Sequence, residues 1–133
     1  MVEIHAYSKA ASGGKQLSAH FKVREFACGD GSDAVLVAPR LVMVLETIRS
    51  YFCAPVVIHS GYRTPQHNAK VNGAPHSQHC YGTAADISVK GQTPAAVAAY
   101  ARQLMPDWGG MGIYAQKGFT HIDVREKKSD WTG

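Results

Sequence analysis

The sequence predicts a single small α+β domain, with a mainly antiparallel sheet flanked by helices. Its 133 residues, 45% of them hydrophobic, are enough to bury one modest core. Two segments carry apolar residues at helical spacing, whereas several short apolar runs have the length and bounding turns of strands. The last two runs are separated by a short glycine-containing turn, which favours an antiparallel hairpin. No internal repeat divides the chain, so we expect residues 1–133 to form one domain.

The first third of the chain is expected to cover the core. Residues 1–16 include a flexible Ser-Gly-Gly stretch and are interpreted as an extended or loosely ordered lead-in. Ser18 is a candidate cap for a short turn. That turn would carry three apolar residues into the core: Phe21, Val23 and Phe26. Residues 28–33 form a turn cluster with two aspartates, but their spacing differs from that of an EF-hand loop, so calcium is not expected there.

The first helix is predicted from Pro39 to about Phe52, because proline is favoured at the first helical position. One apolar stripe of core residues follows at helical spacing: Leu41, Val44, Leu45, Ile48 and Phe52. The next apolar run, 55–58, is interpreted as a buried strand that leads into a Ser-Gly-Tyr-Arg sequence at 60–63.

The segment 63–81 is polar and rich in turn residues, with one helical turn expected near 67–70. Long irregular segments inside small domains are usually functional or disordered, and the many His, Asn, Gln and Arg residues here favour function. A second strand is predicted at 84–89. Thr93 is then a cap and Pro94 the first residue of a helix. This helix should end near Leu104 and turn four residues inward: Val97, Tyr100, Ala101 and Leu104.

The C-terminal hairpin should pair a glycine-rich strand at 109–114 with a strand at 119–125. Residues two apart on a strand point to the same side. His121 and Asp123 should therefore share one face of the sheet, while Ile122 faces the core.

His79, Asp86 and His121 are the candidate metal ligands. Asp86 lies near the start of the second strand, seven positions after His79, and His121 lies in the last predicted strand. Neighbouring strands can bring such side chains to one face. Two histidines and a carboxylate are a common ligand set for catalytic zinc, which lowers the pKa of a bound water to roughly 7. The alternative is a chance spacing, since the chain contains seven histidines.

Three motifs are specific enough to compare with known protein families: SGYRTPQHN from Ser60, SQHCYGTAADI from Ser77 and FTHIDVR from Phe119. Together they resemble the zinc peptidases that cut peptidoglycan peptides, the D-alanyl-D-alanine carboxypeptidases and phage-endolysin-like endopeptidases. Their superfamily also contains lysostaphin-type enzymes and the hedgehog signalling domain. The resemblance covers about residues 17–131, and it implies the α+β fold of that superfamily.

The resemblance also implies a site. It implies one zinc ion per chain, bound by His79, Asp86 and His121. Arg63 of the SGYR sequence would bind the substrate carboxylate or a developing oxyanion, a task that suits a permanently charged, forked guanidinium. Three further residues are candidates for substrate binding: Tyr62, His67 and Ser77.

The C-terminal motif departs from that of several relatives. They carry a catalytic acid three residues before the last zinc histidine, where this chain has Gly118, and others have HxH where this chain has HxD. Two assignments are therefore open. We favour His121 as the third zinc ligand and Asp123 as the catalytic base or an orienting residue; the reverse would make Asp123 the ligand.

The predicted function is that of a zinc metallopeptidase acting on peptidoglycan stem peptides, as an endolysin-type endopeptidase or a D,D-carboxypeptidase. The alternative is a non-catalytic, zinc-containing module that binds cell wall. A net charge of +4 suits an anionic partner. No basic helix, zinc-finger spacing or aromatic–basic alternation indicates nucleic acid, and we expect a monomer.

The expected place of action follows from the N-terminus and the cysteines. The N-terminus lacks the apolar run of a signal peptide, and no segment reaches membrane-spanning length. Three cysteines without a CxxC pattern favour reduced thiols over a disulfide framework. We therefore expect synthesis in the cytoplasm, action on the cell wall after release through a partner pore such as a phage holin, and no membrane partner.

Overall fold

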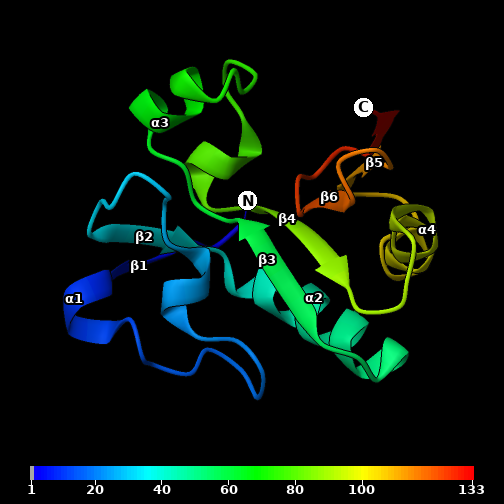
Figure 1. Ribbon diagram of the computed structural model, residues 1–133, viewed down its shortest axis with the longest axis horizontal. Helices are drawn as coiled ribbons and strands as arrows, with labels where there is room; N and C mark the ends of the chain where they lie inside the picture. Colours follow the sequence, from blue (N-terminus) through cyan, green and yellow to red (C-terminus); the bar gives the residue numbers. More distant parts are fainter. Residues whose placement is uncertain (1) are drawn as a thin grey trace.

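A five-stranded sheet is the centre of the fold in the computed structural model, which describes residues 2–133 (Figure 1). Its neighbouring strands are, in spatial order, β3 (Val56–Ser60), β4 (Ala84–Val89), β6 (Phe119–Asp123), β5 (Gly110–Tyr114) and β7 (Ser129–Thr132). All pairs are antiparallel except β5 with β7, which are parallel. The predicted α+β class and the predicted β5–β6 hairpin are both confirmed.

Of the two forms expected for the N-terminal lead-in, extended or loosely ordered, residues 2–16 take the extended form in part, as a strand followed by a short helix. Strand β1 (His5–Ser8) pairs antiparallel with β2 (Ala34–Val37), and the short helix α1 (Lys9–Ser12) follows β1 directly. This pair lies to one side of the main sheet (Figure 1). A carboxylate from a distant turn holds the β1–α1 junction: Asp33 accepts hydrogen bonds from the Ser8 hydroxyl (2.7 Å) and the Ala10 backbone N–H (2.8 Å). A contact of this range could not be read from local sequence.

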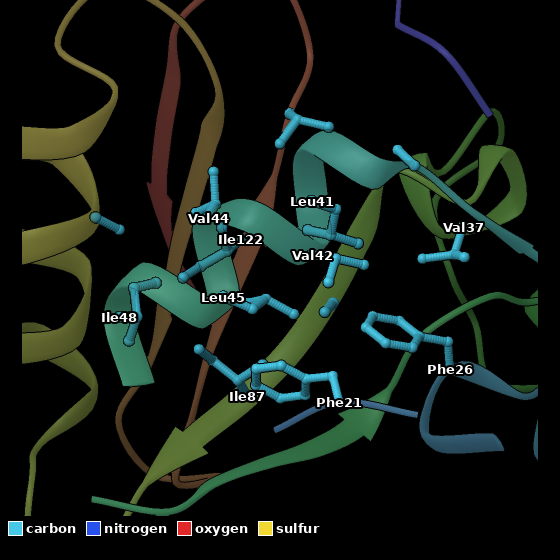
Figure 2. Close-up of a cluster of buried hydrophobic side chains, with 14 of the residues drawn as sticks. Phe21, Phe26, Val37, Leu41, Val42, Val44, Leu45, Ile48, Ile87 and Ile122 are labelled. Atoms are coloured by element: carbon cyan, nitrogen blue, oxygen red, sulfur yellow. The ribbon is translucent and has the colours of Figure 1, made fainter. Parts of the chain in front are cut away.

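The predicted turn after Ser18 is a 3₁₀ helix, η1 (Val23–Phe26), and its cap is Lys22 rather than Ser18. The role expected for its apolar residues is confirmed. Phe21, Val23 and Phe26 are fully buried. Figure 2 shows Phe21 next to Ile87 of β4, and Phe26 on the side of Val37 and Val42.

Helices α2 (Pro39–Phe52) and α4 (Pro94–Leu104) begin and end where the sequence predicts. Both begin with proline, and the Thr93 hydroxyl of α4 accepts the Ala96 N–H as its cap. The apolar stripe of α2 faces the sheet, and Figure 2 shows its residues directed at Ile87 and Ile122. Among residues 2–133, none of the helices has the length and apolar character needed to cross a membrane.

Alternation along the strands separates the core from a polar face. Ala85, Ile87 and Ile122 are completely buried on the helix-covered side, whereas Asp86 and His121 point to the opposite side. The buried strand predicted at 55–58 is present as β3, but it is only half-buried. It is an edge strand that pairs only with β4, so alternate residues face solvent and Val57 is 52% exposed.

The polar segment between β3 and β4 crosses over the polar face of the sheet. It contains α3 (Pro65–Lys70), which confirms the helical turn predicted there, and a second 3₁₀ helix, η2 (Gln78–Tyr81). Gly82 ends η2 in the left-handed conformation, with a φ of 75°. A side chain at this position would also collide with the Leu36 carbonyl oxygen, 2.6 Å from an ideal Cβ.

Two constraints therefore require glycine at position 82: the left-handed backbone and the close approach of Leu36. Gly91 is a matched control, because only the backbone constraint applies there. Gly91 has a φ of 80° but open space around it. We predict that Gly91→Ala lowers the free energy of unfolding by about 1–2 kcal/mol through backbone strain. Gly82→Ala should lower it by about 1–3 kcal/mol more, because backbone atoms of Leu36 must move. Denaturant unfolding monitored by circular dichroism measures both; equal losses would contradict the close approach.

Candidate metal centre

The pairing of β4 with β6 places two of the predicted ligands side by side. Asp86 and His121 are direct cross-strand neighbours in the antiparallel register. His79 reaches the same point from η2, where the Ser77 hydroxyl accepts the His79 N–H and caps the helix. All three side chains are buried, with exposed fractions of 2–7%. The structure thus brings together the His79, Asp86 and His121 set, with ligand atoms within 4.8 Å of one another.

In each histidine, the ring nitrogen that faces away from Asp86 makes a hydrogen bond to an acceptor. This bond determines which nitrogen carries the proton and which one has a lone pair for a metal. His79 Nδ1 lies 2.7 Å from the Gly61 carbonyl oxygen, which can only accept, so Nδ1 carries the proton. His121 Nε2 lies 2.8 Å from an Asp123 carboxylate oxygen and donates in the same way. In the neutral rings, His79 Nε2 and His121 Nδ1 therefore present lone pairs.

Both lone pairs point to the same oxygen of Asp86. Its Oδ1 is 3.2 Å from His79 Nε2 and 3.1 Å from His121 Nδ1. Three electron-rich atoms at these separations repel one another unless a proton or a cation lies among them. Tetrahedral zinc with bonds of about 2.0–2.1 Å holds its ligand atoms about 3.3 Å apart. The donor set, its burial and its spacing therefore fit a zinc ion.

Arg63 binds the other oxygen of Asp86. Its Nη2 lies 3.2 Å from Asp86 Oδ2, and its Nε donates to the Ser60 hydroxyl at 3.1 Å. A β-bulge between Ile58 and Ser60 brings Ser60 opposite Asp86, and the chain then turns Arg63 back over the sheet. Burial alone would raise the pKa of Asp86. When protons rather than a cation lie between this carboxylate and the two histidines, the resulting hydrogen bonds outweigh burial and keep the pKa well below its ordinary value. Asp86 is thus an ionised ligand candidate.

Asp123 is completely buried and has all its acceptor sites engaged. Its Oδ1 accepts from the Gly110 N–H (3.0 Å) and from the backbone N–H and Nε of Arg125 (3.1 and 2.9 Å). Its Oδ2 accepts from Arg125 Nη2 (2.7 Å) and His121 Nε2 (2.8 Å). Burial by itself would raise the pKa of Asp123. The hydrogen bonds from His121 and Arg125 have the larger effect, and they hold this pKa well below its ordinary value. Asp123 therefore contacts the side of His121 away from Asp86.

Glycines in β5 make room for this arrangement. A Cβ on Gly110 would collide with the Asp123 carboxylate, and one on Gly112 would collide with the indole of Trp131. Trp131 of β7 packs against the His121 ring at a centroid distance of 4.9 Å and lies beneath the Arg125 guanidinium at 5.3 Å. The glycine-rich strand is thus needed for close approach of side chains from β6 and β7.

The three donors open onto a pocket of about 470 Å³, a volume typical of small-molecule and peptide sites. Predicted site residues Arg63 and Ser77 line it, together with the three metal-ligand candidates. Tyr62 and His67, expected to bind substrate, are not among its lining residues. His67 instead faces the turn at residues 28–33, where its Nε2 lies over Gly29.

The pocket also has lining residues that sequence reasoning missed: Tyr114, Phe119, Arg125 and Trp131. Trp131 donates to the Tyr114 hydroxyl at 2.8 Å, and Tyr114 stacks on Phe119. Arg125 was not among the predicted site residues. Its sequence signal was the HxDxR spacing, because an arginine two residues after a buried aspartate can fold back onto it.

An α+β domain with a buried His-Asp-His group beside an open pocket is the architecture of a candidate metal-dependent hydrolase. Comparison with protein families makes this specific. The model of the family described as Peptidase M15 matches residues 13–123, and the chain belongs to this family. The protein is therefore a metallopeptidase, which confirms the family resemblance of its motifs. No curated protein matches the chain in a sequence comparison.

Proposed function

We propose that this protein is a zinc peptidase that hydrolyses amide bonds in peptidoglycan stem peptides, with one zinc ion held by His79, Asp86 and His121. The observation that carries the proposal is the convergence of two imidazole lone pairs and one carboxylate oxygen at the floor of a pocket. Members of the Peptidase M15 family are zinc-dependent, which supports the choice of metal. Action on the cell wall, after release from the cytoplasm, belongs to the same proposal.

The zinc ion would supply a water of lowered pKa and would polarise the scissile carbonyl. The protein supplies charge and position. Arg63 holds Asp86 as an ionised ligand and lines the pocket, where a substrate carboxylate or oxyanion would bind. Apart from Asp86, no acidic residue lines the pocket among the described residues, whereas Arg63, Lys117 and Arg125 do. This positive lining suits the carboxylate-bearing stem peptides of peptidoglycan.

Asp123 is best assigned as a positioning residue rather than the base. Its carboxylate fixes the tautomer and orientation of His121, as carboxylates behind metal-bound histidines commonly do. Its lone pairs are already taken by His121, Arg125 and Gly110, so none is free to take a proton from a substrate or a water. This supports His121 as the third ligand, through Nδ1.

The metal prediction compares His79→Ala with His59→Ala. Wild-type protein should carry about one more zinc ion per chain than His79→Ala, and the latter should lose hydrolysis, because one of three ligands is gone. His59 is exposed on β3, away from the pocket, and its alanine variant should match wild type. Elemental analysis measures the zinc, and mass spectrometry of digested peptidoglycan shows which bond is cut. Binding to peptidoglycan without any cleavage would favour the non-catalytic module instead.

The arginine prediction concerns Arg63→Lys. Lysine keeps the charge but cannot contact Asp86, Ser60 and a substrate anion at once, because it lacks the planar fork. We expect hydrolysis to fall by about 10²–10³, as for loss of one oxyanion donor, with zinc content retained. Arg49→Lys, on the partly exposed surface of α2, is the control. Wild-type turnover in the Arg63 variant would limit Arg63 to a structural role.

The positioning prediction concerns Asp123→Asn. The neutral amide weakens the hold on His121, so zinc affinity should fall by about 10–100-fold, measured by competition with a chelator. Excess zinc should restore occupancy, with reduced activity. Asp107→Asn, at an exposed position, should change neither quantity. Unchanged zinc affinity together with lost hydrolysis would show that Asp123 acts as the base.

A further inference from the structure

A second group of metal-ligating side chains lies outside the pocket. Cys28, Asp30 and His67 come together between the turn after η1 and the helix α3, with ligand atoms within 4.8 Å of one another. Each contributes a different donor: a thiol, a carboxylate and an imidazole. The sequence shows no motif for this group, because 37 positions separate Asp30 from His67.

Local hydrogen bonds hold the group in place. Asp30 Oδ2 accepts from the Thr64 hydroxyl, and Asp30 Oδ1 accepts from the Ser32 N–H, both at 2.8 Å. The Thr64 hydroxyl in turn accepts from the His67 N–H at 3.2 Å, which caps α3. Gly29 lies under the His67 ring, with Nε2 only 3.5 Å from where a Cβ would be. The imidazole edge is thereby directed at the turn that carries Cys28 and Asp30.

The chemistry of the group selects the kind of ligand. Cys28 is 3% exposed, so its sulfur is not accessible to a peptide or other bulky substrate, and a nucleophilic role is excluded. A small ion can still enter, because Asp30 is exposed and His67 is only partly buried. Calcium and magnesium prefer all-oxygen sites, whereas sulfur and imidazole nitrogen favour zinc and similar thiophilic metals.

We propose that Cys28, Asp30 and His67 form a second metal site, which binds a thiophilic divalent cation such as Zn²⁺. Cys28 binds as the thiolate, so binding releases the thiol proton to solvent. Thiolate and carboxylate together balance the charge of the divalent cation. Three protein ligands leave a further position for water on the exposed side.

A metal ion at this site would stabilise the segment that positions Arg63, one of the residues lining the pocket. It joins the turn at residues 28–33 to α3, and the next residue of that helix, Asn68, is buried. Asn68 Oδ1 accepts from Arg63 Nη1 at 3.2 Å, and its Nδ2 donates to the Ala74 carbonyl at 3.0 Å. A cation bound at Cys28, Asp30 and His67 therefore anchors α3. Through Asn68, this helix in turn holds Arg63 and the segment around Ala74.

The test is a Co²⁺ titration of full-length, metal-free His79→Ala protein, in which the first centre has lost a ligand. A thiolate bound to Co²⁺ gives a charge-transfer band in the near ultraviolet, and the His-Asp-His group contains no thiolate. We expect this band to saturate at one equivalent and to disappear when Zn²⁺ is added. Co²⁺ should also raise the melting temperature of this variant. The result does not depend on peptidase activity, so the proposed function and this site can fail separately.

Matched variants assign the ligands. In the same background, Cys28→Ser should abolish the band, whereas Cys53→Ser and Cys80→Ser should keep it. Because Cys28 is buried and its variant could misfold, His67→Ala at a partly exposed helix position provides the second test. It should weaken Co²⁺ binding by about tenfold or more. The proposal is overturned if the band is absent, if it survives Cys28→Ser, or if His67→Ala binds Co²⁺ as tightly as its parent.

Discussion

The antiparallel pairing of Asp86 with His121 is the constraint on which the centre depends. These two residues are direct neighbours across β4 and β6, and the residues beside them, Ala85 and Ile122, are buried in the core. A slip of one residue in either strand would exchange the two faces, placing a charge in the core and an isoleucine in the pocket. The hydrophobic core therefore maintains the register that brings the metal-ligand candidates together.

The second constraint is the burial of charge. Asp86 and Asp123 are buried carboxylates, and burying an unpaired charge is costly. Arg63 compensates the first through one hydrogen bond, and Arg125 compensates the second through two side-chain hydrogen bonds. Because both arginines reach in from the pocket side, the charges that stabilise the carboxylates also line the site. The same two guanidinium groups thus compensate buried charge and give the pocket a positive lining.

The elements that sequence predicted well are those with local signals. Proline at the first helical position and an apolar stripe located α2 and α4 to the residue, because capping and periodicity are properties of consecutive residues. Strands β2 and β7 were missed, and β1 lies in a lead-in that was expected only to be extended or loosely ordered. Each of these strands has four residues, and its partner is not the next element along the chain. The N-terminal strand is held by Asp33 and by pairing with β2, which no window of the first 16 residues contains.

The sequence by itself determined the family, the α+β class and the three metal-ligand candidates, because the motif spacing and the strand alternation are encoded in short segments. Only the tertiary structure decided how each side chain is used. It gave His121 an orienting partner in Asp123, placed Trp131 on that ring, and directed His67 away from the pocket toward Cys28. The physical reason is common to all three. Hydrogen-bond partners and packing neighbours from separate segments meet only once the chain has folded, so the roles that they set cannot be read from residue type and spacing.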